Sequence, residues 1–94
     1  MLEVTSDSTF KIKETVSVKN ILNESFFILD SSTGKQYDLT EMEFEIVDSI
    51  DKGITFGEIV NKIATEYSMS TKQIKNDLTE YFTSLFEAGL ILAK

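Results

Sequence analysis

Several residue types that carry chemistry or covalent cross-links are missing from this chain of 94 residues. It contains no cysteine, which excludes disulfides, thiolate catalysis and iron–sulfur clusters. It contains no histidine, so it lacks the commonest zinc ligand and the usual general base near neutral pH. No apolar run approaches the roughly 18 residues of a membrane-spanning helix, and the N-terminus has neither the basic start nor the apolar core of a signal peptide. We therefore expect a cytoplasmic protein.

Positive charge is scarce and comes from a single residue type. Nine lysines and no arginine stand against sixteen acidic residues, which gives a formal net charge of -7 at pH 7. A chain without arginine cannot make the bidentate arginine contact to guanine or phosphate. The negative charge also repels nucleic acids and anionic membranes at long range. We expect neither of them as a partner.

The first half of the chain has the pattern of β-strands. Apolar and polar residues alternate in Phe10–Lys13 and again in Val16–Lys19, as they do in strands with one buried face. Phe26–Leu29 is a continuous apolar run, which predicts a central strand covered on both faces. Asp30–Gly34 has the composition of a turn and Lys35–Leu39 alternates again, so these last two strands are expected to form a hairpin.

The second half has the pattern of three helices. Each begins with a capping box, in which a threonine or serine and a glutamate or glutamine three residues later satisfy backbone N–H groups. The boxes are Thr40-x-x-Glu43, Thr55-x-x-Glu58 and Ser70-x-x-Gln73. Apolar residues at helical spacing follow each box, and Gly53 and Gly89 are expected to end the first and third helices. Leu90–Leu92 then returns to the core or adds a short strand.

Together these patterns predict one α+β domain spanning residues 1–94. A small three-stranded antiparallel sheet, at about 10–39, precedes three helices at about 40–88. Two short helices followed by a longer one resemble a helix-turn-helix core, and the adjoining sheet makes the predicted domain winged-helix-like. A chain of this size buries roughly 60–65% of its unfolded surface, which is enough for one core.

No pattern of catalytic residues is recognisable. The sixteen carboxylates show no spacing that marks an acid–base pair, and a serine nucleophile would have no histidine as its base. The segment Asp30–Gly34 lacks the acidic spacing of a calcium loop. We therefore expect a binding protein, with no enzymatic activity, no cofactor and no metal. The acidic residues of the first helix, among them Glu41, Glu45 and Asp48, form either a solvated face or a docking patch for a basic partner.

Two binding modes fit a winged-helix-like domain. In one, the third helix contacts DNA and the protein is a transcriptional regulator, although Lys72 and Lys75 alone do not make a basic stripe. In the other, the strand Lys35–Leu39 lies at a sheet edge beside the third helix and accepts a peptide as an added strand. Leu78 and Tyr81 then form pockets for the peptide, or they pack in the core, as apolar stripes at this spacing usually do.

The apolar and turn residues between Tyr37 and Ile91 follow a particular order and spacing. They are Tyr37, Leu39, Ile46, Val47, Ile50, Asp51, Gly53, Thr55, Glu58, Ile59, Val60, Ile63, Tyr67, Ile74, Asp77, Leu78, Phe82, Leu85, Gly89, Leu90 and Ile91. This order resembles that of the PqqD-like proteins, which are recognition elements for ribosomally made, modified peptides. Family members often have asparagine after the leucine and small residues early in the first helix, where this chain has Thr40, Glu43 and Phe44.

The resemblance implies that the protein binds the leader segment of a precursor peptide as an added strand and presents the peptide to a modifying enzyme. Carried over by position, the edge residues are Lys35, Gln36, Tyr37, Asp38 and Leu39, and the helix wall is Ile74, Asp77, Leu78 and Tyr81. Small free-standing members resemble the recognition proteins of lasso-peptide pathways, which work beside a separate leader peptidase. Others resemble proteins that escort peptides to radical-SAM enzymes. An open sheet edge also allows a homodimer.

Overall fold

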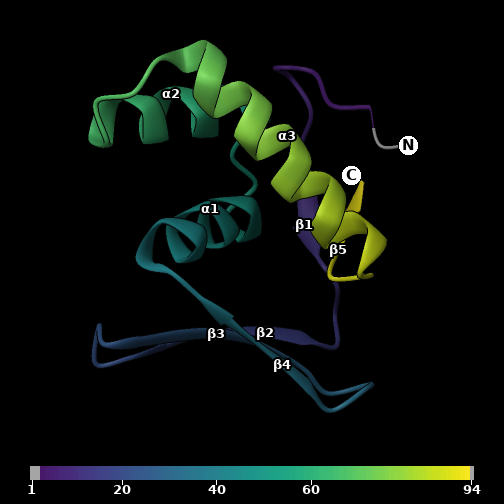
Figure 1. The fold of residues 1–94 in the computed structure, drawn as a ribbon. Helices are drawn as coiled ribbons and strands as arrows, with labels where there is room; N and C mark the ends of the chain where they lie inside the picture. The colour runs from purple at the N-terminus through teal and green to yellow at the C-terminus, as the bar shows by residue number, and fades with distance from the viewer. Residues whose placement is uncertain (1–2, 94) are drawn as a thin grey trace.

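The computed structural model describes residues 3–93 and has the predicted α+β architecture (Figure 1). A sheet forms one layer, α1 lies directly on it, and α2 and α3 lie beyond α1. The elements in chain order are β1 (Phe10–Ile12), β2 (Val16–Ile21), β3 (Ser25–Asp30), β4 (Lys35–Leu39), α1 (Glu41–Asp51), α2 (Phe56–Glu66), α3 (Thr71–Glu87) and β5 (Ile91–Ala93).

The main sheet is antiparallel with the order β2-β3-β4, so β3 is the predicted central strand. Ile28 pairs with Val18 on one side and with Tyr37 on the other, and these three side chains therefore point to the same face. That face contacts α1, and Ile28 is only 1% exposed. The period of two along each strand thus fixes which residues of β4 face the helices.

The strand at Phe10–Ile12 does not belong to this sheet, contrary to the expectation that the sheet begins at about residue 10. β1 pairs with β5 in a separate two-stranded ladder, with Phe10 opposite Ala93. A turn between the strands, closed by a 2.9 Å bond from Val16 N–H to the Lys13 carbonyl, redirects the chain before β2 begins. Both alternatives for the segment after Gly89 occur, because Leu90 and Ile91 are buried in the core and Ile91–Ala93 forms β5.

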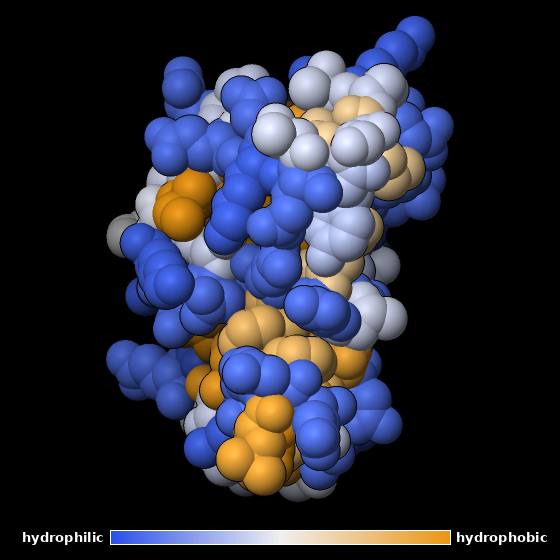
Figure 2. Space-filling view, turned by 90° about the vertical axis from the view of Figure 1, so that its left-hand side faces the viewer, coloured by the Kyte–Doolittle hydropathy of each residue, from blue (hydrophilic) through white to orange (hydrophobic). Residues whose placement is uncertain are grey.

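The second face of β3 is open, so the prediction that this strand is covered on both faces is wrong. Phe27 and Leu29 point away from α1 and remain partly exposed. Beside them the β2–β3 turn presents Ile21 and Leu22, which are 49% and 84% exposed. Figure 2 shows a hydrophobic patch over this turn, at the bottom of the view, surrounded by hydrophilic residues.

All three helices begin at the predicted caps, but only the first box is complete. The Thr40 hydroxyl accepts from the Glu43 N–H at 3.1 Å, and the Glu43 carboxylate accepts from the Thr40 N–H at 2.9 Å. At α2 and α3 the N-cap hydroxyl accepts its bond, whereas the reciprocal side-chain bond is absent from the described residues. Gly53 and Gly89 follow α1 and α3 with φ near +75°, which suits glycine after a helix.

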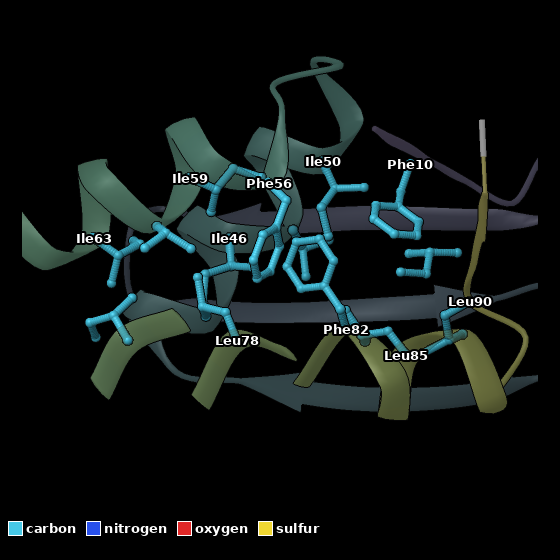
Figure 3. Packing of buried hydrophobic residues seen from close by; sticks show 14 of the residues in the cluster. Phe10, Ile46, Ile50, Phe56, Ile59, Ile63, Leu78, Phe82, Leu85 and Leu90 are labelled. Carbon is cyan, nitrogen blue, oxygen red and sulfur yellow. The ribbon is translucent and has the colours of Figure 1, made fainter. Parts of the chain in front are cut away.

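The core lies between α1, α2, α3 and β1 (Figure 3). Phe82 is fully buried at its centre and meets Phe10 and Phe56 edge-to-face, with ring centroids 5.3 and 5.1 Å apart. The apolar stripes of the helices supply the remaining contacts, including Ile46, Ile50, Ile59, Ile63, Leu78 and Leu85. Across residues 3–93, none of the helices has the length and apolar character needed to cross a lipid bilayer.

Candidate peptide-binding site

The strand β4 lies at an edge of the sheet. It pairs with β3 along one side, and no other strand of residues 3–93 pairs with its other side. The backbone N–H and C=O groups on that side are therefore available to an incoming strand, which would lie about 4.8 Å away. Tyr37 and Leu39 point inward and are partly buried, while Gln36 and Asp38 point outward and are exposed.

The turn before β4 holds this edge in place. The carboxylate of Asp30, which is 4% exposed, accepts bonds from the Ser32 hydroxyl at 2.7 Å, the Ser32 N–H at 3.0 Å and the Thr15 hydroxyl at 3.0 Å. The bond from the Ser32 hydroxyl is the main reason why the pKa of Asp30 lies below its usual value. Gly34 completes the turn with φ +74°. The predicted turn thus fixes the start of β4 relative to β3.

A groove of about 320 Å³ borders the inner side of this edge. Its walls come from the end of β4, the last two turns of α3, the first turn of α1 and the segment that follows α3. The lining residues are Ile28, Tyr37, Asp38, Leu39, Glu43, Tyr81, Ser84, Leu85, Ala88 and Leu90. Most of the lining is apolar, so the groove suits the apolar side chains of a strand added to β4.

Some of the predicted site residues line this groove, and the others lie along the strand edge, in the core or on the surface of α3. On the strand, Tyr37, Asp38 and Leu39 line the groove, while Lys35 and Gln36 lie exposed along the same edge. On the helix, Tyr81 lines the groove.

The other three predicted helix residues lie elsewhere. Ile74 and Leu78 are 2% and 3% exposed and belong to the core, so their side chains are not accessible to a peptide. Asp77 is exposed, accepts bonds from the side chain of Gln73, and does not line the groove. The wall is therefore displaced by about one to two helical turns toward the C-terminus of α3.

The groove residues of α3 that were not predicted are Ser84, Leu85 and Ala88, and they lie on the same face of the helix as Tyr81. Tyr81, Ser84, Leu85 and Ala88 have the spacing i, i+3, i+4 and i+7, which places them in one row along a helix. This spacing is visible in the sequence when it is counted from Tyr81. Serine and alanine add little to an apolar pattern, and so a search for large apolar residues passes over them.

Two acidic side chains and no basic one are found among the ten lining residues. Burial raises the pKa of Tyr81 far above its usual value, and the nearby Glu43 carboxylate raises it further. The phenol therefore stays protonated and can donate a hydrogen bond into the groove.

The acidic residues of α1 do not form one uniform exposed row. Glu41 is exposed, and Asp48 forms an ion pair with Lys52 at 2.8 Å. Glu45 is partly buried, and the adjacent Glu66 carboxyl together with burial raises its pKa to about 7.

Two solved structures have the same fold over nearly their whole length. One is "TbiB1 in Complex with the TbiA(beta) Leader Peptide", at 26% identity and a TM-score of 0.79, covering 86% of this chain and 93% of that one. The other is "Lasso peptide synthetase B1 complexed with the leader peptide", at 23% identity and a TM-score of 0.80, covering 88% and 96%. No curated protein sequence matches the chain.

The family of coenzyme PQQ synthesis protein D (PqqD) matches residues 26–91. The match runs from β3 to the start of β5, so it includes the edge strand, all three helices and every residue that lines the groove. It covers well over half of the sequence and agrees with the resemblance noted from the spacing of the apolar residues. The chain therefore belongs to the PqqD family.

Proposed function

We propose that this protein captures the leader segment of a ribosomally synthesised precursor peptide as a strand added to β4, and presents the peptide to a modifying enzyme or leader peptidase. The observation that carries the proposal is the apolar groove directly beside the open edge of β4. Leader peptides are bound in the two structures of the same fold, and the protein at 26% identity makes the transfer of function reasonable.

The two parts of the site have different tasks in this proposal. Backbone hydrogen bonds along β4 supply affinity that depends little on the peptide sequence. Every residue except proline offers the same backbone N–H and C=O groups. Selectivity comes from the groove, where inward-pointing side chains of the added strand meet Tyr37, Tyr81 and Leu85. Neither part requires a catalytic group, and we propose that the protein itself performs no reaction.

No observation favours the alternative of a DNA-binding regulator. Lys72 and Lys75 are exposed near the start of α3, but Asp77 and Glu80 follow on the same helix and are exposed as well. In a chain with a net charge of -7 these two lysines do not create a basic surface.

A second copy of the protein can use the same edge. Pairing of β4 with β4 of another copy would satisfy the same backbone groups that a leader peptide uses. We propose that the two forms compete, so that a peptide which binds β4 converts any dimer of this kind to monomers. Light scattering with increasing peptide concentration measures this conversion, and a dimer that keeps its mass when saturated with peptide would contradict it.

The short open reading frames beside the gene supply the test of leader binding. Overlapping 20-residue peptides from these frames are labelled and titrated with the protein by fluorescence anisotropy. We expect one N-terminal segment to bind in the micromolar range or more tightly. If no peptide from any neighbouring frame binds, the proposed function is wrong.

The binding mode is tested on the same peptide by backbone N-methylation, one residue at a time. In an added strand, alternate N–H groups point toward β4 and the others point away. We therefore expect N-methylation to weaken binding at every second residue only. Equal sensitivity at adjacent residues, or none at all, would exclude strand addition while leaving binding itself intact.

A further inference from the structure

The groove beside β4 contains a carboxylate for which residues 3–93 supply no ion-pair partner. Its two acidic lining residues point to different sides of the sheet. Asp38 pairs with Phe27, so its side chain is on the outer face, where it accepts a bond from the Gln36 amide at 3.2 Å. Glu43 comes from the first turn of α1 and is the carboxylate on the inner side of the groove.

The capping box holds Glu43 in position. One carboxylate oxygen, Oε1, accepts from the Thr40 N–H at 2.9 Å, while the Glu43 N–H donates to the Thr40 hydroxyl at 3.1 Å. Within residues 3–93 the second oxygen accepts no hydrogen bond, and no lysine forms an ion pair with this residue. The negative charge of Glu43 contributes to the raised pKa of the neighbouring Tyr81. Glu43 thus brings to the lining of the groove a carboxylate with one oxygen that accepts no hydrogen bond within residues 3–93.

A peptide that fills the groove excludes water from this oxygen. Covering an unpaired carboxylate with apolar side chains is unfavourable, whereas a cation on the peptide offsets the loss of hydration. Side chains two residues apart on an added strand point to the same face, about 7 Å from each other. Because Glu43 lines the same groove as Tyr81 and Leu85, we expect the inward position two residues from an apolar residue over Tyr81 and Leu85 to face Glu43.

We propose that Glu43 is a specificity-determining residue that selects a lysine or arginine in the bound segment, two residues from its apolar anchor. This inference rests on the proposed function and defines the peptide class further: an inward apolar residue paired with an inward cation.

The structure allows the charge to be removed without removing the cap. Glutamine also forms capping boxes, since its amide oxygen can accept the Thr40 N–H in place of the carboxylate. Glu43→Gln should therefore keep α1 intact and lose only the charge. Glu58→Gln is the matched control, because Glu58 has the same position in α2, is exposed and lies outside the groove. Both variants change the net charge equally.

The experiment is a selection from a displayed library of random 12-residue peptides at physiological salt. The targets are the unchanged protein, Glu43→Gln and Glu58→Gln, each checked for its thermal unfolding midpoint. For the unchanged protein and Glu58→Gln, we expect enriched peptides with lysine or arginine two residues from an apolar position. For Glu43→Gln, the apolar preference should remain and the cation preference should disappear.

Titration of the best selected peptide measures the size of the effect. Glu43→Gln, or replacement of the peptide cation by norleucine, should each weaken binding about fivefold, and the two changes together should weaken it hardly further. A cation preference that survives in Glu43→Gln, or apolar binders without any cation preference, would overturn this inference and leave the proposed function standing. If the N-methylation pattern shows that none of the selected peptides binds as a strand along β4, both the proposed function and the inference are wrong.

Discussion

The two edges of the main sheet differ in what lies beside them. β2 and β4 each pair with β3 on one side only within residues 3–93, so both expose backbone groups that can accept a further strand. Beside β4, the end of α3 forms an apolar wall and leaves a groove. At the far end of β2 there is instead a turn with two exposed aliphatic side chains, Ile21 and Leu22. An open edge becomes a selective site only where a neighbouring element supplies pockets for side chains.

The most direct challenge to this comparison is to fill the groove. Ala88 lines it and is exposed at the C-cap of α3, so Ala88→Phe places a ring in the groove without entering the core. We expect peptide affinity to fall by at least about tenfold, because the inward side chains of the peptide lose their space. Anisotropy titration measures the loss.

The matched change at the other edge is Ser17→Phe. Ser17 is a small exposed residue of β2 on the outer face of the sheet. This variant should bind peptide as the unchanged protein does. If Ser17→Phe impairs binding and Ala88→Phe does not, the peptide uses β2 and the assignment of the site is wrong.

Removing the ring of Tyr81 tests the helix wall. Tyr81 is partly buried and faces β4 across the groove, and its truncation removes apolar contact area from any bound peptide. Tyr81→Ala should weaken binding by roughly fivefold to tenfold, equivalent to about 1 kcal/mol or slightly more. Tyr81→Phe should retain most of the affinity unless the hydroxyl donates to the peptide.

Tyr67→Ala serves as the control for the stability loss that such a truncation brings. Tyr67 is also partly buried, but it caps α2 and lies outside the groove. It should lower the urea midpoint by a similar amount and leave peptide affinity unchanged. Equal loss of affinity in both variants would mean that binding follows stability rather than contact with the wall.

Much of the fold was predictable because local signals and tertiary structure agree. The N-cap residues Thr40, Thr55 and Ser70 mark the starts of the three helices, and Gly53 and Gly89 mark two of the ends. The partner of β1 was not predictable in this way. Alternation of polar and apolar residues identifies a strand and its buried face, but it carries no information on which strand pairs with it.

The candidate site was predictable on the strand and less so on the helix. The strand Lys35–Leu39 was predicted with its bounds, and the structure places it at an edge of the sheet. The helix wall depends on how far along α3 the core ends, which is set by the elements that pack against this helix. Ile74 and Leu78 are buried in the core, and the groove begins only at Tyr81. A one-dimensional pattern does not show which part of a continuous stripe its neighbours cover.

A pH dependence is expected from α1, which lies over both edges. The adjacent Glu66 carboxyl, with which a protonated Glu45 can share its proton, raises the pKa of Glu45 from 4.5 to about 7, and burial adds to the effect. The charge of Glu41 raises this pKa further, while Lys62 opposes the rise. Native Glu45 thus holds a proton between pH 4.5 and 7 that unfolded Glu45 releases. Stability should fall as pH rises through this window.

Glu45→Gln removes this dependence and isolates it from the groove. Because Glu45 is only partly buried and solvent screens its charge, we expect the variant to gain no more than about 1 kcal/mol at pH 8. At pH 5 the gain should be close to zero. Urea unfolding at the two pH values measures both numbers. A variant whose stability still falls from pH 5 to pH 8 as in the unchanged protein would contradict this assignment.

The smallest expected effect concerns the turn at the end of β2. Leu22 has φ +54°, a left-handed conformation that disfavours a leucine by about 1–2 kcal/mol, while glycine adopts it freely. Its side chain is 84% exposed, so removing it sacrifices little packing. Leu22→Gly loses some of this gain through the entropy of the unfolded chain and should stabilise the protein by about 0.5 kcal/mol.

Peptide affinity should stay the same, because the turn lies outside the groove. A loss of affinity in this variant would show that the β2–β3 turn takes part in peptide binding, and the contrast between the two edges would then be incomplete.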